Sequence, residues 1–156
     1  MPTQTSAKPI GAEPTLDVRM DVELNAPRDR VFHALIHDFA AWFNVDGGAG
    51  MRMTLEPHVG GRMWRDLGEA GGHLWGTVQV IKPPTLLESA CPLLVSLPSL
   101  SHLTFRLHDA NETTTKLEFR HLAIGMFPEG EMYDQVHTGW HNTLAKEFKA
   151  HVERHH

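Results

Sequence analysis

The sequence predicts an α+β fold in which an antiparallel β-sheet packs against a long C-terminal α-helix. From about residue 51 to residue 121, apolar and polar residues alternate in short runs separated by glycines and prolines, which is typical of antiparallel strands. From Glu131 to Arg154, apolar side chains instead recur at the spacing of an amphipathic helix. Because a helix of this length must bury its apolar stripe and most other elements are strands, we expect it to lie on the sheet.

The first predicted strand begins near Leu16, and a short helix follows it directly. Apolar residues alternate with charged ones along this strand, so one of its faces is expected to be buried. Its apolar positions are Val18, Met20, Val22 and Leu24. Asn25 is the expected helix cap and Pro27 suits the first helical turn. The short helical region is expected to end near Phe43.

The middle of the chain is expected to supply the other strands. The glycines of residues 60–61 and 68–72 predict turns, and the prolines of residues 83–84 end a strand because proline cannot donate to the ladder. The two prolines between Cys91 and Ser101 predict an irregular connection there. The predicted strands cover residues 51–56, 62–67, 73–82, 85–90, 103–107 and 115–119.

The last two predicted strands form the clearest hairpin. Their apolar residues share one face if Leu107 lies opposite Thr115, which leaves a loop from Asp109 to Thr113. This register places His121 on the same inward face as Phe119. The opposite face, which we expect to meet water, carries His102 and His108.

Composition limits the class of protein. A chain of 156 residues suits one domain, which we expect to span residues 16–154 after a flexible tail of residues 1–15. The net charge of -5 disfavours nucleic-acid binding. No run of residues is apolar and long enough to span a membrane. With a single cysteine and no secretory signal, the sequence favours the cytoplasm.

Four segments, in this order, resemble the SRPBCC superfamily, and most closely its branch similar to the activator of the heat shock protein 90 ATPase. They are Ala26–Leu35, Val59–Arg62, Gly76–Val78 together with Pro83–Leu87, and Gly139-Trp140. The resemblance covers residues 16 to about 152. It implies a helix-grip fold, in which a curved sheet wraps around the C-terminal helix and leaves a cavity that often holds an apolar molecule. Because the family includes lipid binders, aromatases and co-chaperone domains, the resemblance implies no single activity.

The candidate ligand-binding residues follow from the two periodicities, which direct His137 and His121 inward. A buried imidazole needs a hydrogen-bond partner, and Tyr133 lies one helical turn before His137. One interpretation is that Tyr133 and His137 satisfy each other in a filled core. The other is that Tyr133, His137 and His121 orient the polar end of a ligand. Its apolar body would then contact Trp140, Phe119, Leu117 and Met20.

Metal and nucleophilic chemistry find little support in the sequence. His137 and His141 have the spacing of zinc ligands on a helix, as do His33 and His37, but no third ligand accompanies either pair. Thr138 stands where a zinc protease would carry its glutamate. A Gly-x-Ser-x-Gly elbow and a phosphate-binding loop are also missing. We therefore predict no metal and no cofactor.

Three functions remain open. The first is binding of an apolar or amphipathic small molecule in an internal cavity. The second is an interaction module that contacts a chaperone or another protein, similar to the heat shock protein 90 ATPase activator. The third is an aromatase-like or cyclase-like enzyme that uses a cavity histidine, although the sequence favours a protein that is not an enzyme. A second copy of the chain is a further expected partner, because homodimers are common.

Overall fold

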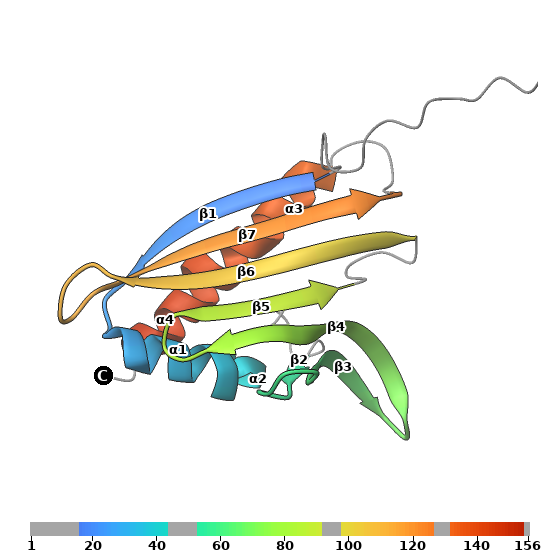
Figure 1. Cartoon of the computed structure of the whole chain (residues 1–156), viewed down its shortest axis with the longest axis horizontal. Helices are drawn as coiled ribbons and strands as arrows, with labels where there is room; N and C mark the ends of the chain where they lie inside the picture. Colours follow the sequence, from blue (N-terminus) through green and yellow to red (C-terminus); the bar gives the residue numbers. More distant parts are fainter. Residues whose placement is uncertain (1–15, 44–52, 92–97, 127–131, 155–156) are drawn as a thin grey trace, which may run out of the picture.

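A curved antiparallel sheet forms one layer of the molecule and the C-terminal helix crosses its inner face (Figure 1). The computed structural model describes residues 16–43, 53–91, 98–126 and 132–154. Within these residues the sheet has seven strands in the order β1-β7-β6-β5-β4-β3-β2. The strands are β1 Leu16–Leu24, β2 Met53–Leu55, β3 Arg62–Gly68, β4 Gly71–Lys82, β5 Leu86–Cys91, β6 Ser99–Asp109 and β7 Thr115–Gly125.

The helices confirm the predicted order of elements. Two short helices, α1 and α2, follow β1, and one long helical segment ends the domain. This segment is continuous from α3 through a π-helical stretch, η1, to α4. The bounds are α1 Arg28–His37, α2 Phe39–Trp42, α3 Met132–Trp140, η1 His141–Phe148 and α4 Lys149–Arg154. The α+β, helix-grip fold class predicted from the sequence is therefore correct. None of the helices in the described part of the chain has the length and apolar character needed to cross a membrane.

The start of α1 differs from the prediction that Asn25 caps it. Pro27 occupies the cap position with extended backbone angles, and the helix begins at Arg28. The backbone N–H of Asn25 instead donates to the Glu153 carboxylate at 2.9 Å, which ties the end of β1 to α4. Asn25 therefore contributes to the docking of the C-terminal helix.

The β6–β7 hairpin has a register two residues away from the predicted one. Asp109 lies opposite Thr115, so the strands remain paired further toward the turn than expected. The Asn111 side chain accepts from the Thr113 backbone N–H at 2.9 Å, and this local bond stabilises a loop that starts later in the chain. Because the shift is an even number of residues, every side chain keeps its predicted face. His121 therefore points inward, as predicted.

The predicted irregular connection from Cys91 to Ser101 is wrong at both ends. Cys91 is the last residue of β5, and β6 already begins at Ser99. Cys91 pairs with Ser101, and Ser101 pairs with Ala123 of β7. The long β7 strand supplies a ladder partner that the local sequence does not reveal. Residues 92–97, with one of the two prolines, lie outside the described residues, as do the predicted tail of residues 1–15 and Met51.

A single apolar row on the C-terminal helix contacts the sheet and α2. Its members are all buried and stand four residues apart: Val136, Trp140, Leu144, Phe148 and Val152. In a regular α-helix, residues spaced by four drift around the axis by about 40° per step, so they could not all face the sheet. The π-helical winding of η1 is looser and offsets this drift. The period of the apolar row thus explains why this helix departs from α geometry.

The packing of the helix can be tested at Phe148. This residue is fully buried and lies against Trp42, with ring centroids 4.5 Å apart. Phe148→Ala should lower the free energy of unfolding by about 3–5 kcal/mol, because the truncation leaves a cavity in the core. Urea denaturation measures the change. The control is Lys146→Ala on the exposed side of the same helix, which should stay within about 0.5 kcal/mol of the wild type. Equal effects of the two substitutions would contradict this packing.

Candidate functional site

A small group of polar residues interrupts the apolar inner face of the sheet. Ser89 of β5 pairs with Leu103 of β6, and Leu103 pairs with His121 of β7, so these residues form one row across three strands. Ser101 lies on the same face, two residues from Leu103 along β6. Ser89, Ser101 and His121 are all fully buried or nearly so. We call Ser89, Ser101 and His121 the polar row.

His121 links this row to the C-terminal helix through two hydrogen bonds. The Trp140 indole N–H donates to His121 Nδ1 at 3.0 Å. Because Nδ1 is the acceptor, the neutral ring carries its proton on Nε2. Nε2 lies 2.8 Å from Ser101 Oγ, so this N–H donates to the serine. The tautomer of His121 is thus determined by Trp140, an indole that can only donate.

Burial keeps this imidazole neutral. It lowers the pKa of His121 from 6.5 to about 4, because the charged ring would lose its hydration inside the protein. Protonation of Nδ1 would also direct an N–H at the Trp140 N–H. At neutral pH the row therefore carries no charge.

The remaining hydrogen-bonding capacity of the buried polar residues is concentrated in two hydroxyls. Thr115 donates to the Ala26 carbonyl and Thr143 to the Gly139 carbonyl, so both are satisfied. Ser101 accepts from His121, which leaves its own O–H proton without an acceptor among the described residues. The Ser89 hydroxyl likewise has no partner within the described part of the chain. Unpaired buried hydroxyls are uncommon in folded proteins, because each has lost water without compensation.

Aromatic rings surround the Trp140 side of the polar row. The Trp140 ring lies 4.5 Å from Phe119 and 5.6 Å from Phe43, measured between centroids. It also makes an edge contact with Phe105 at 6.3 Å. The polar row therefore adjoins an aromatic wall, an arrangement suited to a molecule with an apolar body and a polar group.

The structure brings together most, but not all, of the seven residues predicted from the sequence. The four predicted residues on strands face the interior, and so does Trp140 of the helix. Of these, Met20 is only partly buried. Tyr133 and His137 differ: their rings stack at 5.9 Å, and Tyr133 is 50% exposed. Both lie in α3, beside the first members of the buried row that begins with Val136. Whether any of the seven contacts a ligand stays a prediction.

Sequence reasoning missed Ser89 and Ser101. Ser89 occupies an inward position of a predicted strand, so its alternation with Leu87 was a usable signal. Ser101 gives no such signal, because the local sequence predicts an irregular connection there. Their proximity to His121 depends on which strands are neighbours, and this information is not local.

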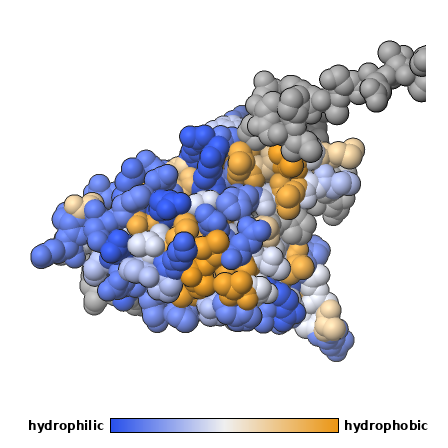
Figure 2. Space-filling view, in the orientation of Figure 1, coloured by the Kyte–Doolittle hydropathy of each residue, from blue (hydrophilic) through white to orange (hydrophobic). Residues whose placement is uncertain are grey.

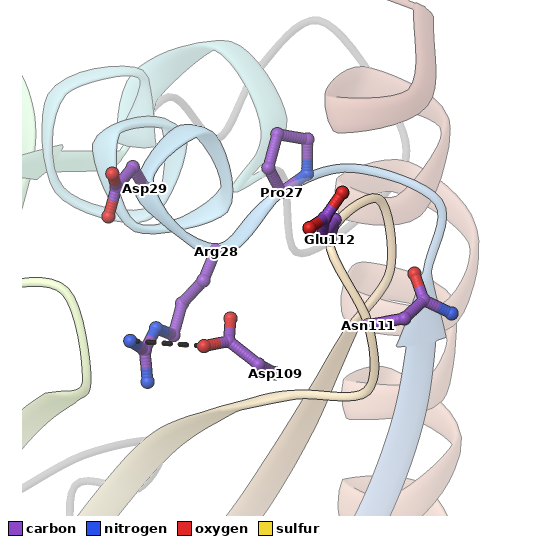
Figure 3. A pocket seen from close by; sticks show the side chains of 6 residues that line it. All are labelled: Pro27, Arg28, Asp29, Asp109, Asn111 and Glu112. Atoms are coloured by element: carbon purple, nitrogen blue, oxygen red, sulfur yellow. Dashed lines mark ion pairs between the residues drawn. The ribbon is translucent and has the colours of Figure 1, made fainter.

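The outer surface has a pocket between the start of α1 and the β6–β7 hairpin. Its volume is about 420 Å³, and the Arg28 side chain extends from α1 to form an ion pair of 3.1 Å with Asp109 (Figure 3). The other lining residues are Pro27, Asp29, Asn111 and Glu112. Because Arg28 and Asp109 neutralise each other and are partly exposed, we regard this pocket as a solvated junction between two elements.

The histidine pairs considered as metal ligands remain pairs. The rings of His33 and His37 lie 4.7 Å apart on an exposed face of α1. Among the described residues no three histidine, cysteine or carboxylate side chains converge to hold a metal ion. The buried imidazole of His121 has both nitrogens in hydrogen bonds and is not available as a ligand.

Comparison with known proteins identifies the type of fold. The family model described as Activator of Hsp90 ATPase homolog 1-like protein matches residues 25–153. No curated protein has a sequence that matches this chain.

Solved structures with a similar fold come from several organisms. A protein from Mesorhizobium loti has 20% sequence identity and a TM-score of 0.68, over 90% of this chain and 98% of that one. CalU16 from Micromonospora echinospora has 21% identity and a TM-score of 0.62, over 87% of this chain and 73% of its own. An HSP90 activator from Plasmodium falciparum has 20% identity and a TM-score of 0.63, over 82% of this chain and 89% of its own. Identities this low establish a shared fold only.

The lowered pKa of His121 predicts how stability depends on pH. The folded pKa of about 4 lies below the unfolded value, so the unfolded chain binds an extra proton between pH 4 and 6.5. The contribution of His121 is therefore complete above pH 6.5 and is lost as the pH falls toward 4. Between pH 7 and pH 5 the wild type should lose about 2 kcal/mol more than His121→Gln, which does not titrate but can still accept and donate. Urea denaturation at both pH values measures this difference, and equal losses would mean that His121 is not buried in neutral form.

The two serines should respond differently to truncation. Ser101→Ala removes the acceptor of the His121 N–H and should cost about 1–2 kcal/mol of unfolding free energy. Ser89→Ala removes a hydroxyl that is buried without a partner, so it should be neutral or stabilise by about 1 kcal/mol. Thermal and urea denaturation of both variants provide the comparison. Similar losses for both would indicate that Ser89 has a partner in the free protein.

Proposed function

Because this chain belongs to the family of Activator of Hsp90 ATPase homolog 1-like proteins within the SRPBCC superfamily, we propose that it binds an apolar or amphipathic small molecule between the sheet and the C-terminal helix. The observation that carries the proposal is the polar row, whose hydroxyls face an otherwise apolar interior without full hydrogen bonding. A purely structural core would be more stable with an apolar side chain in place of Ser89, whose hydroxyl is buried without a partner among the described residues.

The composition of the surrounding wall supports an apolar ligand body. Trp140, Phe119 and Phe105 supply flat aromatic surfaces beside the polar row. Leu117 and Met20 extend the apolar surface along β7 and β1. In this proposal Tyr133 and His137 lie at the rim, where a partly exposed tyrosine can contact the ligand as it enters.

The same geometry disfavours His121 as a catalytic base. A base needs a free nitrogen, whereas Nδ1 already accepts from Trp140 and Nε2 already donates to Ser101. Its pKa of about 4 also makes it a weak proton acceptor at neutral pH. We therefore favour binding over an aromatase-like or cyclase-like reaction.

A second candidate function is contact with a protein partner through the outer face of the sheet. This face is largely hydrophilic, with hydrophobic side chains gathered in separate areas (Figure 2). Leu100 and Ile124 form an exposed cross-strand pair there, at 56% and 42% exposure. The family description and the fold shared with an HSP90 activator make a chaperone the natural partner to test. The homodimer and the cytoplasmic location stay predictions.

A substitution that enlarges a side chain inside the proposed site tests whether the site is a ligand cavity or a filled core. Ala123 is buried on β7 opposite Ser101. If the site is a cavity, Ala123→Leu should leave the unfolding free energy within about 1 kcal/mol of the wild type and abolish binding of a small molecule that co-purifies. If the core is filled, the same change should cost about 1–3 kcal/mol through overpacking.

Non-denaturing mass spectrometry and urea denaturation measure the two quantities. The matched control is Ala110→Leu in the exposed β6–β7 loop, which should retain both the bound molecule and the stability. A wild-type protein that carries and binds no small molecule, together with a destabilised Ala123→Leu, would contradict the proposal and favour the second candidate.

A further inference from the structure

The hydrogen bonds of the polar row all run in one direction. The Trp140 indole donates to His121, and His121 donates to Ser101. Because the indole N–H cannot accept a hydrogen bond, His121 cannot exchange its donor and acceptor nitrogens without losing the bond to Trp140. The series therefore ends in the O–H proton of Ser101, a donor that still needs an acceptor.

Ser89 places a second donor beside the first. Ser89 lies opposite Leu103, and Ser101 is two residues from Leu103 on the same face of β6. Such diagonal neighbours on adjacent strands have Cα atoms about 7–8 Å apart, and their side chains stand on the same face of the sheet. One acceptor atom in that space can approach both hydroxyls.

The charge of the surroundings restricts which acceptor is suitable. The buried polar residues of the described chain are serine, threonine and one histidine, and burial keeps that histidine neutral. An anionic acceptor such as a carboxylate would lose its hydration without a compensating positive charge. A neutral oxygen with two lone pairs avoids this cost.

We infer that the small molecule bound at the polar row carries a neutral carbonyl group, as in a ketone, an ester or a quinone, whose oxygen accepts from Ser101 and Ser89. This inference rests on the function proposed above. It assigns the ligand class from the direction of the hydrogen bonds. Trp140 and His121 act as positioning residues, because they orient the Ser101 hydroxyl and do not contact the carbonyl oxygen.

Three naphthalene derivatives of similar size test the inference. They are acetylnaphthalene, which has a ketone; ethylnaphthalene, a hydrocarbon of nearly the same shape; and naphthoate, an anion. Titration calorimetry on the purified full chain should give the ketone about tenfold tighter binding than the hydrocarbon, as expected for hydrogen bonds to buried donors. Naphthoate should bind more weakly than the hydrocarbon.

Substitution of the serines should remove this preference selectively. Ser101→Ala and Ser89→Ala should each weaken ketone binding by about threefold to tenfold and leave hydrocarbon binding unchanged. The double variant should bind the two molecules equally. Thr104→Ala, which removes a hydroxyl from the outer face of the same strand, is the control and should retain the full preference.

The outcomes distinguish this inference from the proposed function. If the ketone and the hydrocarbon bind equally well to the wild type, or naphthoate binds most tightly, the carbonyl assignment is wrong and the binding function stands. If none of the three binds, both proposals are overturned. If the serine variants lose hydrocarbon binding as well, the serines shape the site without recognising a carbonyl, and the inference is wrong.

Discussion

Burial of one row of side chains on the C-terminal helix is the constraint on which the rest of the structure depends. The row runs from Val136 to Val152 in steps of four residues, and it stays in line because η1 is wound more loosely than an α-helix. Trp140 is the second member of this row, so its indole reaches the inner face of the sheet and donates to His121. The same docking brings the far end of the helix to α1 and the end of β1, where the Glu153 carboxylate accepts from the Asn25 backbone. A helix with regular winding would turn part of the row away from the sheet.

The three residues of the polar row differ in how far hydrogen bonds compensate their burial. His121 is compensated on both nitrogens, and Ser101 gains one bond from it. Ser89 was transferred from water with no partner among the described residues, which is unfavourable by the desolvation of a hydroxyl. A core selected for stability alone would place an apolar residue at this position, as at the neighbouring inward positions Leu87 and Leu103. The proposed ligand supplies the missing acceptor and gives a physical reason for the serine.

Structures that share this fold at about one-fifth identity include an HSP90 activator and CalU16. A fold alone does not specify an activity. In this chain the inner face combines an aromatic wall with two hydroxyl donors and no charge. The outer face instead carries ion pairs such as that of Asp17 with Arg120 at 2.9 Å, where hydrogen bonding to Arg120 lowers the pKa of Asp17. In the proposed function this division places the small molecule on the inner face and leaves the outer face to solvent or to a protein partner.

The sequence by itself determined the order of elements, the strand faces and the inward direction of His121 and Trp140. Apolar alternation along a strand and apolar spacing along a helix are local signals, so they can be identified without knowing which strands are neighbours. Only the tertiary structure decided the hairpin register, the early start of β6 and the proximity of Ser89 and Ser101 to His121, because these depend on pairing between segments that are distant in sequence. It also placed Tyr133 and His137 at the margin of the core. The reason is that Val136 lies one helical turn before Trp140 and is buried with it, which leaves Tyr133 and His137 at the flank of the row.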